Sequence, residues 1–382
     1  LYFIAGKVRK SNKVTVPEIM GARYGKAASI IAALCVMLAY VGVLATQLKA
    51  AADIIVLLCA SSGIEISHGL ALTICTALIA IITVGGGLVS VAYSDAISAL
   101  LMIGGFFLAI PFLIGVANSQ GATLPPEKMT ITGGMSGWEL LGYFLPSLAL
   151  MLGDQNMLQR FASAKNSDEA KKSNIGMFIG EILVIISIVL VVTQAAKLYP
   201  TLDVPSNVIF QVAVDYLPLA FGALVMCACM AFIVTTADSY LLVSVQTCVH
   251  DIGKTIRPQM PERTEISLSR IFSIVLPLGA LVIALYIHNA YNILMFAWSF
   301  YAASAGIPAF AALFWKKATK TGVMAGLLGG FVVCVGWKLA GQPFGLGAAV
   351  PGTVACGIAL VVVSLATYKR APSVFLKAEK QS

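Results

Sequence analysis

Long, continuous apolar runs alternate with short polar loops along most of the chain. An α-helix needs about 20 mainly apolar residues to cross the hydrocarbon core of a bilayer, which is about 30 Å thick. The runs predict ten such helices, at residues 27–59, 70–89, 96–117, 138–158, 173–197, 217–247, 267–288, 291–314, 322–339 and 347–368. The first and sixth exceed the thickness of a bilayer, so we expect them to tilt or to project into water.

The composition agrees with a chain surrounded by lipid. Of its 382 residues, 59% are hydrophobic and only 11% are charged, and the mean hydropathy is +0.91. A soluble domain carries about 25% charged residues. Because the runs are continuous and do not alternate, they favour spanning helices over a β-barrel. We therefore expect an all-α, polytopic membrane protein in which residues 1–382 form a single transmembrane domain.

Basic residues gather in alternate loops, and the formal net charge is +8. The basic segments are residues 7–26, 160–172, 254–263, 316–320 and 369–382. The intervening loops hold mainly Lys128, Lys197 and Lys338. By the positive-inside rule, the basic loops and the C-terminal tail 369–382 face the cytoplasm, which predicts a multi-pass protein of the cell's inner (plasma) membrane. Short basic loops do not form the continuous basic face that nucleic-acid binding would need.

The ends and the reactive residues add two expectations. Residues 1–5 are apolar and precede a basic stretch, so we expect them to be the cut end of a preceding span, in a chain truncated at its N-terminus. The eight cysteines form no C-x-x-C pair, and the three histidines are scattered. The sequence therefore indicates no disulfide framework, no zinc site and no catalytic constellation, and we expect no enzyme.

Ionisable residues inside spans are costly, which makes each of them a functional candidate. Asp154 lies late in a span that also holds Gly142 and Pro146. These residues weaken a helix, and a discontinuous helix can turn freed backbone groups toward a ligand. The alternative is that Asp154 lies near the cytoplasmic end of its span and is merely hydrated.

A second polar group surrounds Asp238 in the long sixth span. Thr235, Asp238 and Ser239 share one face of a helix, and their oxygens suit a hard cation such as sodium. Alternatively, the hydroxyls bond back to carbonyls of their own helix. Asp95 stands at the predicted start of the third span, where a plain capping role rivals a functional one. Gln47, on the first span, is more typical of packing.

Several stretches resemble the sodium:solute symporter family, which includes carriers of proline, pantothenate and glucose. The matching stretches are residues 15–25 (T-V-P-E-I-M-G-A-R-Y-G), 86–88 with 94–95, 154–155 with 159–160 and 163–165, 235–239, and 306–308 with 314–319. They occur in the order and topology of the family over residues 6–322.

The resemblance implies a LeuT-like core of two inverted five-helix repeats, with solute and sodium bound at the midplane. Residues 27–314 would hold core helices three to ten, and residues 322–368 two accessory spans. In the family, backbone carbonyls of the first broken helix complete the main sodium site. That helix would belong to the N-terminal part that we expect to be missing.

Family roles carry over to individual positions. For the main sodium site, the resemblance implies the hydroxyls of Thr235 and Thr236 and the backbone carbonyl of Phe232. For a second cation site it implies Asp95, Asp238 and Ser239. Asp238 departs from the serine that is usual there, so an acid could strengthen cation binding or let a proton couple instead. For the solute it implies Asp154, Gln155 and Asn156, with Tyr40 and Gln47 as weaker candidates.

These expectations describe a secondary active transporter that imports a small polar organic solute with sodium by alternating access. Its partners would be the solute, sodium and the lipid bilayer, with no cofactor other than the coupling ion. A symporter-like sensor that binds a solute without transport is the alternative, and an integral membrane enzyme is a third. The sequence does not identify the solute, the stoichiometry or the oligomeric state.

Overall fold

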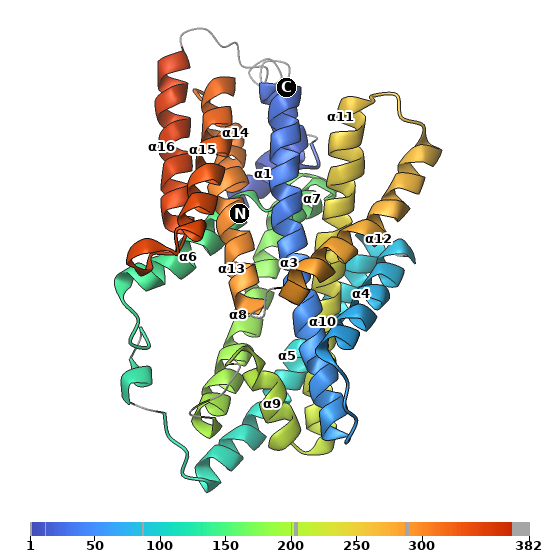
Figure 1. Ribbon diagram of the computed structural model, residues 1–382, viewed down its shortest axis with the longest axis vertical. Coiled ribbons are helices and arrows are strands. Elements are labelled where there is room, and N and C mark those ends of the chain that lie inside the picture. Colours follow the sequence, from blue (N-terminus) through green and yellow to red (C-terminus); the bar gives the residue numbers. More distant parts are fainter. Residues whose placement is uncertain are drawn as a thin grey trace.

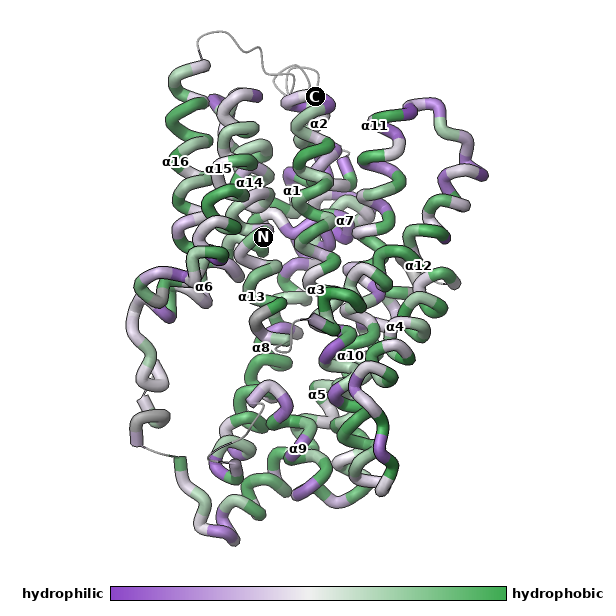
Figure 2. The backbone as a smooth tube through the Cα atoms, in the orientation of Figure 1, coloured by the Kyte–Doolittle hydropathy of each residue, from purple (hydrophilic) through white to green (hydrophobic). Residues whose placement is uncertain are grey.

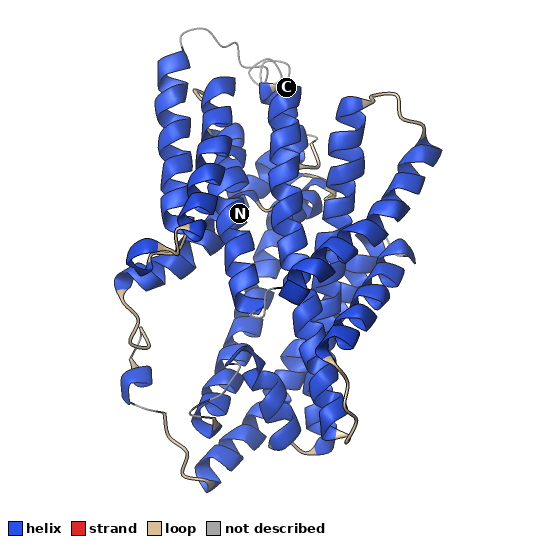
Figure 3. Ribbon diagram, viewed as in Figure 1, coloured by secondary structure: helices blue, strands red, loops and turns tan. Residues whose placement is uncertain are grey.

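The computed structural model describes residues 2–11, 13–85, 88–124, 126–130, 132–199, 201, 205–286 and 290–368. Every regular element in these ranges is a helix (Figures 1 and 3). The α-helices are α1 (Tyr2–Ser11), α2 (Val16–Tyr24), α3 (Lys26–Ser61), α4 (His68–Gly85), α5 (Leu88–Ser119), α6 (Gly137–Gly153), α7 (Gln155–Ala162), α8 (Ser167–Leu198), α9 (Val208–Asp215), α10 (Leu219–Gln246), α11 (Lys254–Ile256), α12 (Glu262–Tyr286), α13 (Ala290–Tyr301), α14 (Ile307–Phe314), α15 (Lys320–Leu339) and α16 (Ala349–Thr367).

Two π-helical stretches continue the longer helices: Thr247–Gly253 joins α10 to α11, and Ala302–Gly306 joins α13 to α14. Short 3₁₀ turns lie at Pro126–Met129, Pro205–Asn207 and Pro343–Gly345. The predicted tail 369–382 and the Gly86–Gly87 part of the family resemblance lie outside the described residues.

Nine helices among the described residues are long and apolar enough to span a bilayer. The remaining predicted span, residues 138–158, divides at Asp154 into α6, of 17 residues, and α7, of eight. The third span also begins earlier than predicted, at Leu88. Nine spans with a tenth broken segment still describe a polytopic membrane protein.

The outward faces of the bundle are apolar. Leu100 on α5, Ile179 on α8 and Val282 on α12 are each more than half exposed. Figure 2 shows hydrophobic colour along the shafts of the helices and hydrophilic colour at end loops such as that between α11 and α12. In water these faces would carry a large hydrophobic cost, so lipid is their natural solvent.

Helix α3 forms the centre of the bundle and packs against α2, α4, α10, α12 and α13 (Figure 1). Tyr40, Leu44 and Leu48 on this helix are almost completely buried. The basic segments at the start of α3, between α11 and α12, and between α14 and α15 all lie at the upper end in Figure 1. The pattern of basic loops therefore corresponds to one end of the molecule.

The break between α6 and α7 has a local cause. Asp154 takes an extended conformation (φ −58°, ψ 114°), and its side chain accepts a hydrogen bond from the Asn156 N–H, which caps α7. The π-helical stretch packs closely on the end of α6, because a Cβ atom at Gly306 would lie 2.5 Å from the Ala149 carbonyl oxygen. The predicted discontinuous helix is confirmed.

Candidate functional site

The carboxylate of Asp154 is enclosed at the break. Its side chain is only 6% exposed. The Tyr40 hydroxyl from α3 donates to Asp154 Oδ1, and the Asn156 N–H donates to the same oxygen at 3.3 Å. The alternative of a merely hydrated Asp154 is therefore wrong. A buried anion held by two donors, beside backbone that has left its helix, is typical of a solute-binding or ion-binding position.

Three tyrosines frame this carboxylate. The Tyr40 ring stacks on Tyr301 at a centroid distance of 5.6 Å and meets Tyr240 edge-on at 4.8 Å. The Tyr301 hydroxyl donates to the carbonyl oxygen of Gly153 at 2.5 Å. The frame thus ties the last residue of α6 to α13, while α3 and α10 supply the other rings. Tyr301 and Tyr240 were not among the residues predicted to bind the solute.

The predicted solute-binding residues divide into two groups. Tyr40, Asp154 and Asn156 come together at the break. Gln155 is completely buried but turns toward the π-helical stretch after α10, where its Nε2 donates to Thr247 Oγ1 at 2.8 Å. Gln47 lies half-buried on α3, about two turns beyond Tyr40.

The residues predicted for the main sodium site form a local group on α10. The Thr235 and Thr236 hydroxyls donate to the Phe232 carbonyl oxygen at 3.2 and 2.7 Å. The structure thus shows the alternative, in which these hydroxyls bond to a carbonyl of their own helix. It does not remove the site, because each hydroxyl oxygen keeps lone pairs for a cation. Two hydroxyls and one carbonyl are hard oxygen donors of the kind sodium accepts, and further oxygens would come from another segment.

Of the residues predicted for the second cation site, Asp95 and Ser239 come together, with the Ser239 hydroxyl 3.5 Å from Asp95 Oδ2, whereas Asp238 does not join them. Asp95 lies inside α5 and not at its start, so the capping role is wrong. Its Oδ2 accepts from Arg160 Nη2 at 2.5 Å, and the same nitrogen donates to Ser239 Oγ at 3.2 Å. Asp238 instead accepts a hydrogen bond from the Thr83 hydroxyl of α4.

Arg160 and Thr83 are the partners that sequence reasoning missed. Arg160 had been counted only as a basic loop residue and as part of the family motif. A usable signal was its position one turn after Asn156, directly beyond the predicted break. The guanidinium donates to both Asp95 and Ser239, so a positive charge of the protein itself already stands beside the predicted second site.

The fold and these groups define a class of protein. A helical membrane bundle with one helix broken at a buried carboxylate, beside an oxygen-rich stretch of a neighbouring helix, is the arrangement of a secondary transporter. Residues 1–330 match the sodium:solute symporter family. The chain belongs to that family.

Individual relatives agree with this assignment. The high-affinity proline transporter PutP of Bacillus subtilis (strain 168) is 25% identical over 385 residues, which cover 96% of this chain and 79% of that protein. The sodium/proline symporter of Haemophilus influenzae is 25% identical over 411 residues, covering 99% and 81%.

A solved structure supports the fold. A sodium-coupled sialic acid symporter, in a substrate-bound outward-open state, superposes with a TM-score of 0.71 at 18% identity. The similarity covers 98% of this chain and 84% of that one, and it confirms the LeuT-like architecture implied by the resemblance. The protein is thus a multi-pass, sodium-coupled solute symporter and not an enzyme. Nothing in these comparisons favours the sensor alternative.

Proposed function

We propose that this symporter imports proline, or an amino acid of closely similar shape, and that Asp154 binds its ammonium group. The observation that carries the proposal is the buried Asp154 carboxylate at the break between α6 and α7. A cationic nitrogen is the natural partner of a buried anion. The names of the two bacterial proline carriers support the same solute.

The aromatic frame suits a small ring-shaped solute. Tyr40, Tyr240 and Tyr301 present apolar ring surface around the carboxylate, and Asn156 adds an amide at the start of α7. A pyrrolidine ring would pack against the tyrosines while its nitrogen faces Asp154. Gln155 and Gln47 remain candidates for a more distant contact.

For the coupling ion, we infer that sodium binds to the Thr235 and Thr236 hydroxyls and the Phe232 carbonyl. Asp95, Asp238 and Ser239 would contribute to a second cation site only after Arg160 releases Asp95. Residues 27–314 would form the core helices three to ten, and 322–368 the accessory pair.

We infer further that the basic end of the bundle faces the cytoplasm and that the protein lies in the plasma membrane. Each sodium ion that moves inward then gains about 2.3 kcal/mol per 100 mV of membrane potential. That energy drives accumulation because sodium and solute stabilise the same conformations, so neither crosses efficiently alone.

The test uses purified protein in sealed proteoliposomes with an inward sodium gradient, and an equal potassium gradient as control. Labelled proline should accumulate only with sodium, in preference to glucose, pantothenate and sialic acid. Preference for one of the other solutes would contradict the proline assignment. Uptake driven by a proton gradient without sodium would contradict the sodium assignment and point to Asp238 as the coupling residue.

A further inference from the structure

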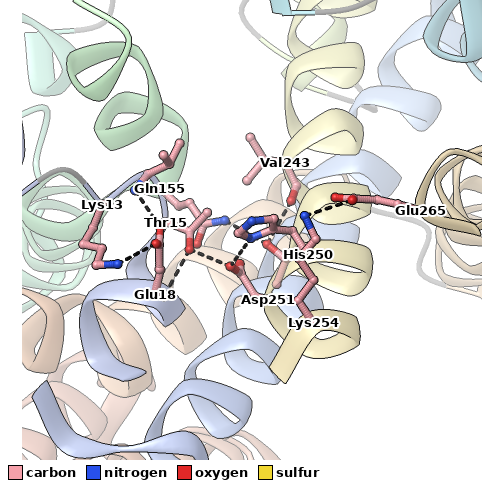
Figure 4. A network of polar contacts seen from close by, with 11 residues as sticks. Lys13, Thr15, Glu18, Gln155, Val243, His250, Asp251, Lys254 and Glu265 are labelled. Atoms are coloured by element: carbon pink, nitrogen blue, oxygen red, sulfur yellow. Dashed lines mark hydrogen bonds and ion pairs between the residues drawn. The ribbon is translucent and has the colours of Figure 1, made fainter. Parts of the chain in front are cut away.

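A second buried polar cluster joins the start of α2, the start of α7 and the π-helical stretch after α10 (Figure 4). The Thr15 hydroxyl, at the N-cap of α2, donates to Asp251 Oδ1 at 2.7 Å. On the neighbouring turn of the same π-helical stretch, Thr247 Oγ1 accepts from Gln155 Nε2 at 2.8 Å. Thr15 and Asp251 are 236 positions apart in the sequence, and Gln155 and Thr247 are 92 positions apart. The two bonds therefore hold α2 and α7 against the end of α10.

A cleft of about 270 Å³ ends on this cluster. Its walls include Lys13, Glu18, His250, Asp251 and Lys254. Two ion pairs flank it, Lys13 with Glu18 and Lys254 with Glu265, each at 2.9 Å. Charged side chains thus line the cleft, while Thr15, Thr247 and Gln155 are buried behind it.

The cluster separates the cleft from the solute-binding residues. Thr15, Thr247 and Gln155 are completely buried and Asp251 is 4% exposed. Gln155 follows Asp154 directly in the chain, so one side chain links the break to the cluster. The cluster therefore connects the break, through Gln155, to the cleft, through Asp251.

The closed arrangement is not fully satisfied. Gln155 Oε1, Gln159 Nε2 and Asp251 Oδ2 are buried and have no hydrogen-bond partner among the described residues. Such atoms cost free energy that water would restore. Two buried hydrogen bonds therefore favour closure, and three unpaired atoms favour opening. The cluster thus carries opposing contributions, as an element that switches between two states does, and π-helical stretches frequently lie at functional sites.

We propose that Thr15, Asp251, Thr247 and Gln155 form the cytoplasmic gate of the transport path. In the closed gate, the loop before α2 and the start of α7 are bonded to the π-helical end of α10. In the open gate these bonds break, and water reaches the unpaired oxygens. The proposal rests on the transport function proposed above, although its test needs neither solute nor sodium.

Cys248 provides a natural reporter for this gate. It directly follows Thr247, is 7% exposed, and its Sγ lies 3.1 Å from Met37 Sδ. We would measure its rate of modification by N-ethylmaleimide in lipid nanodiscs, with peptide mass spectrometry as the readout. Cys334, completely buried in α15, serves as an internal control for general unfolding.

Loss of the Thr15–Asp251 bond should open the gate more often. We expect Thr15→Val to raise the modification rate of Cys248 about tenfold, the effect of losing one buried hydrogen bond to a charged group. Asp251→Ala should raise it less, because it also removes the unpaired Oδ2. Cys334 should stay protected. Asp251→Asn, which keeps the acceptor oxygen, and Thr15→Ser, which keeps the hydroxyl, should stay close to the wild-type rate.

Two further variants separate gating from other effects. Thr15 also caps α2, so Thr319→Val, which removes the equivalent cap of α15, controls for the loss of a cap and should leave the Cys248 rate unchanged. Modification that rises at both cysteines, or at neither, in Asp251→Ala and Thr15→Val would overturn the gate. Because no solute is present, failure of proline uptake would refute the proposed solute without changing this result.

Discussion

The broken helix α6–α7 and the unbroken helix α10 both place oxygen atoms inside the bundle, but they do so differently. At the break, partners from other helices satisfy the freed groups: Tyr301 bonds the Gly153 carbonyl and Tyr40 bonds Asp154. On α10 the helix stays intact, and Thr235 and Thr236 bond to a carbonyl of their own turn. The hydrogen bonds of the first group come from distant helices, whereas those of the second lie within one helix.

This difference predicts that the two groups have separate roles in solute binding and in sodium binding. The break has a fixed, enclosed carboxylate, so changes there should affect solute binding strongly. The hydroxyls of α10 have their own partners and would bind a cation only together with oxygens from elsewhere, so changes there should affect sodium dependence and leave solute selectivity intact. Five substitutions, grouped in four experiments, test the contrast in order of decreasing effect.

Asp154→Asn should have the largest effect. Removing the charge of a buried, hydrogen-bonded carboxylate that faces a cationic group should lower the kcat/KM of proline uptake on the order of 100-fold. Asp168→Asn, at an exposed position in the first turn of α8, is the matched control and should transport normally. Near-normal uptake by Asp154→Asn in proteoliposomes would remove Asp154 from the solute site.

Thr235→Ala and Thr236→Ala should each raise the sodium concentration for half-maximal uptake about tenfold, because each removes one oxygen that would contact a charged ion. The maximal rate in saturating sodium should change little. Thr193→Ala removes a hydroxyl that bonds back to Val189 on α8 in the same way, and it should leave sodium dependence unaltered. An unchanged sodium titration in both α10 variants would contradict the main sodium site.

Tyr40→Phe keeps the ring and removes one donor to Asp154. We expect the KM for proline to rise about fivefold, the equivalent of about 1 kcal/mol for a net hydrogen bond. Tyr240→Phe is the control, because this ring packs on Tyr40 at the same site but its hydroxyl does not bond to Asp154. Equal effects of the two substitutions would mean that the frame acts through packing alone.

Asp238→Ser should have the smallest effect. Asp238 bonds to Thr83 and stands apart from the Arg160–Asp95 pair, and serine keeps an oxygen for Thr83. We expect a shift of about twofold in the sodium titration, and uptake that still requires sodium. If Asp238→Ser abolished accumulation, or removed a proton-driven component of it, Asp238 would be the coupling residue.

Much of the architecture could be predicted from the sequence. The positions of nine spans, the discontinuous helix around Asp154 and the symporter family follow from apolar run length, helix-weakening residues and local motifs. The partners in the sites could not be predicted in the same way. Tyr40 and Asp154 are 114 residues apart, and Arg160 and Asp95 are 65 apart, with no local pattern that couples them.

Gln155 shows the limit most clearly. It adjoins Asp154 in the sequence and shares the same family motif, yet it bonds to Thr247 and belongs to the cluster near the basic end. The side chains of adjacent residues at a helix break face different directions, and only the surrounding helices determine what each side chain contacts.

The sequence by itself determined the membrane class and the approximate spans, because a bilayer requires long apolar helices whose backbone groups are satisfied locally. It also identified where costly polar residues enter the bundle. Only the tertiary structure decided which of them meet: Tyr40 with Asp154, Arg160 with Asp95, and Thr15 with Asp251. The physical reason is that a buried polar group must find a partner, and the packing of distant helices decides which partner lies within reach.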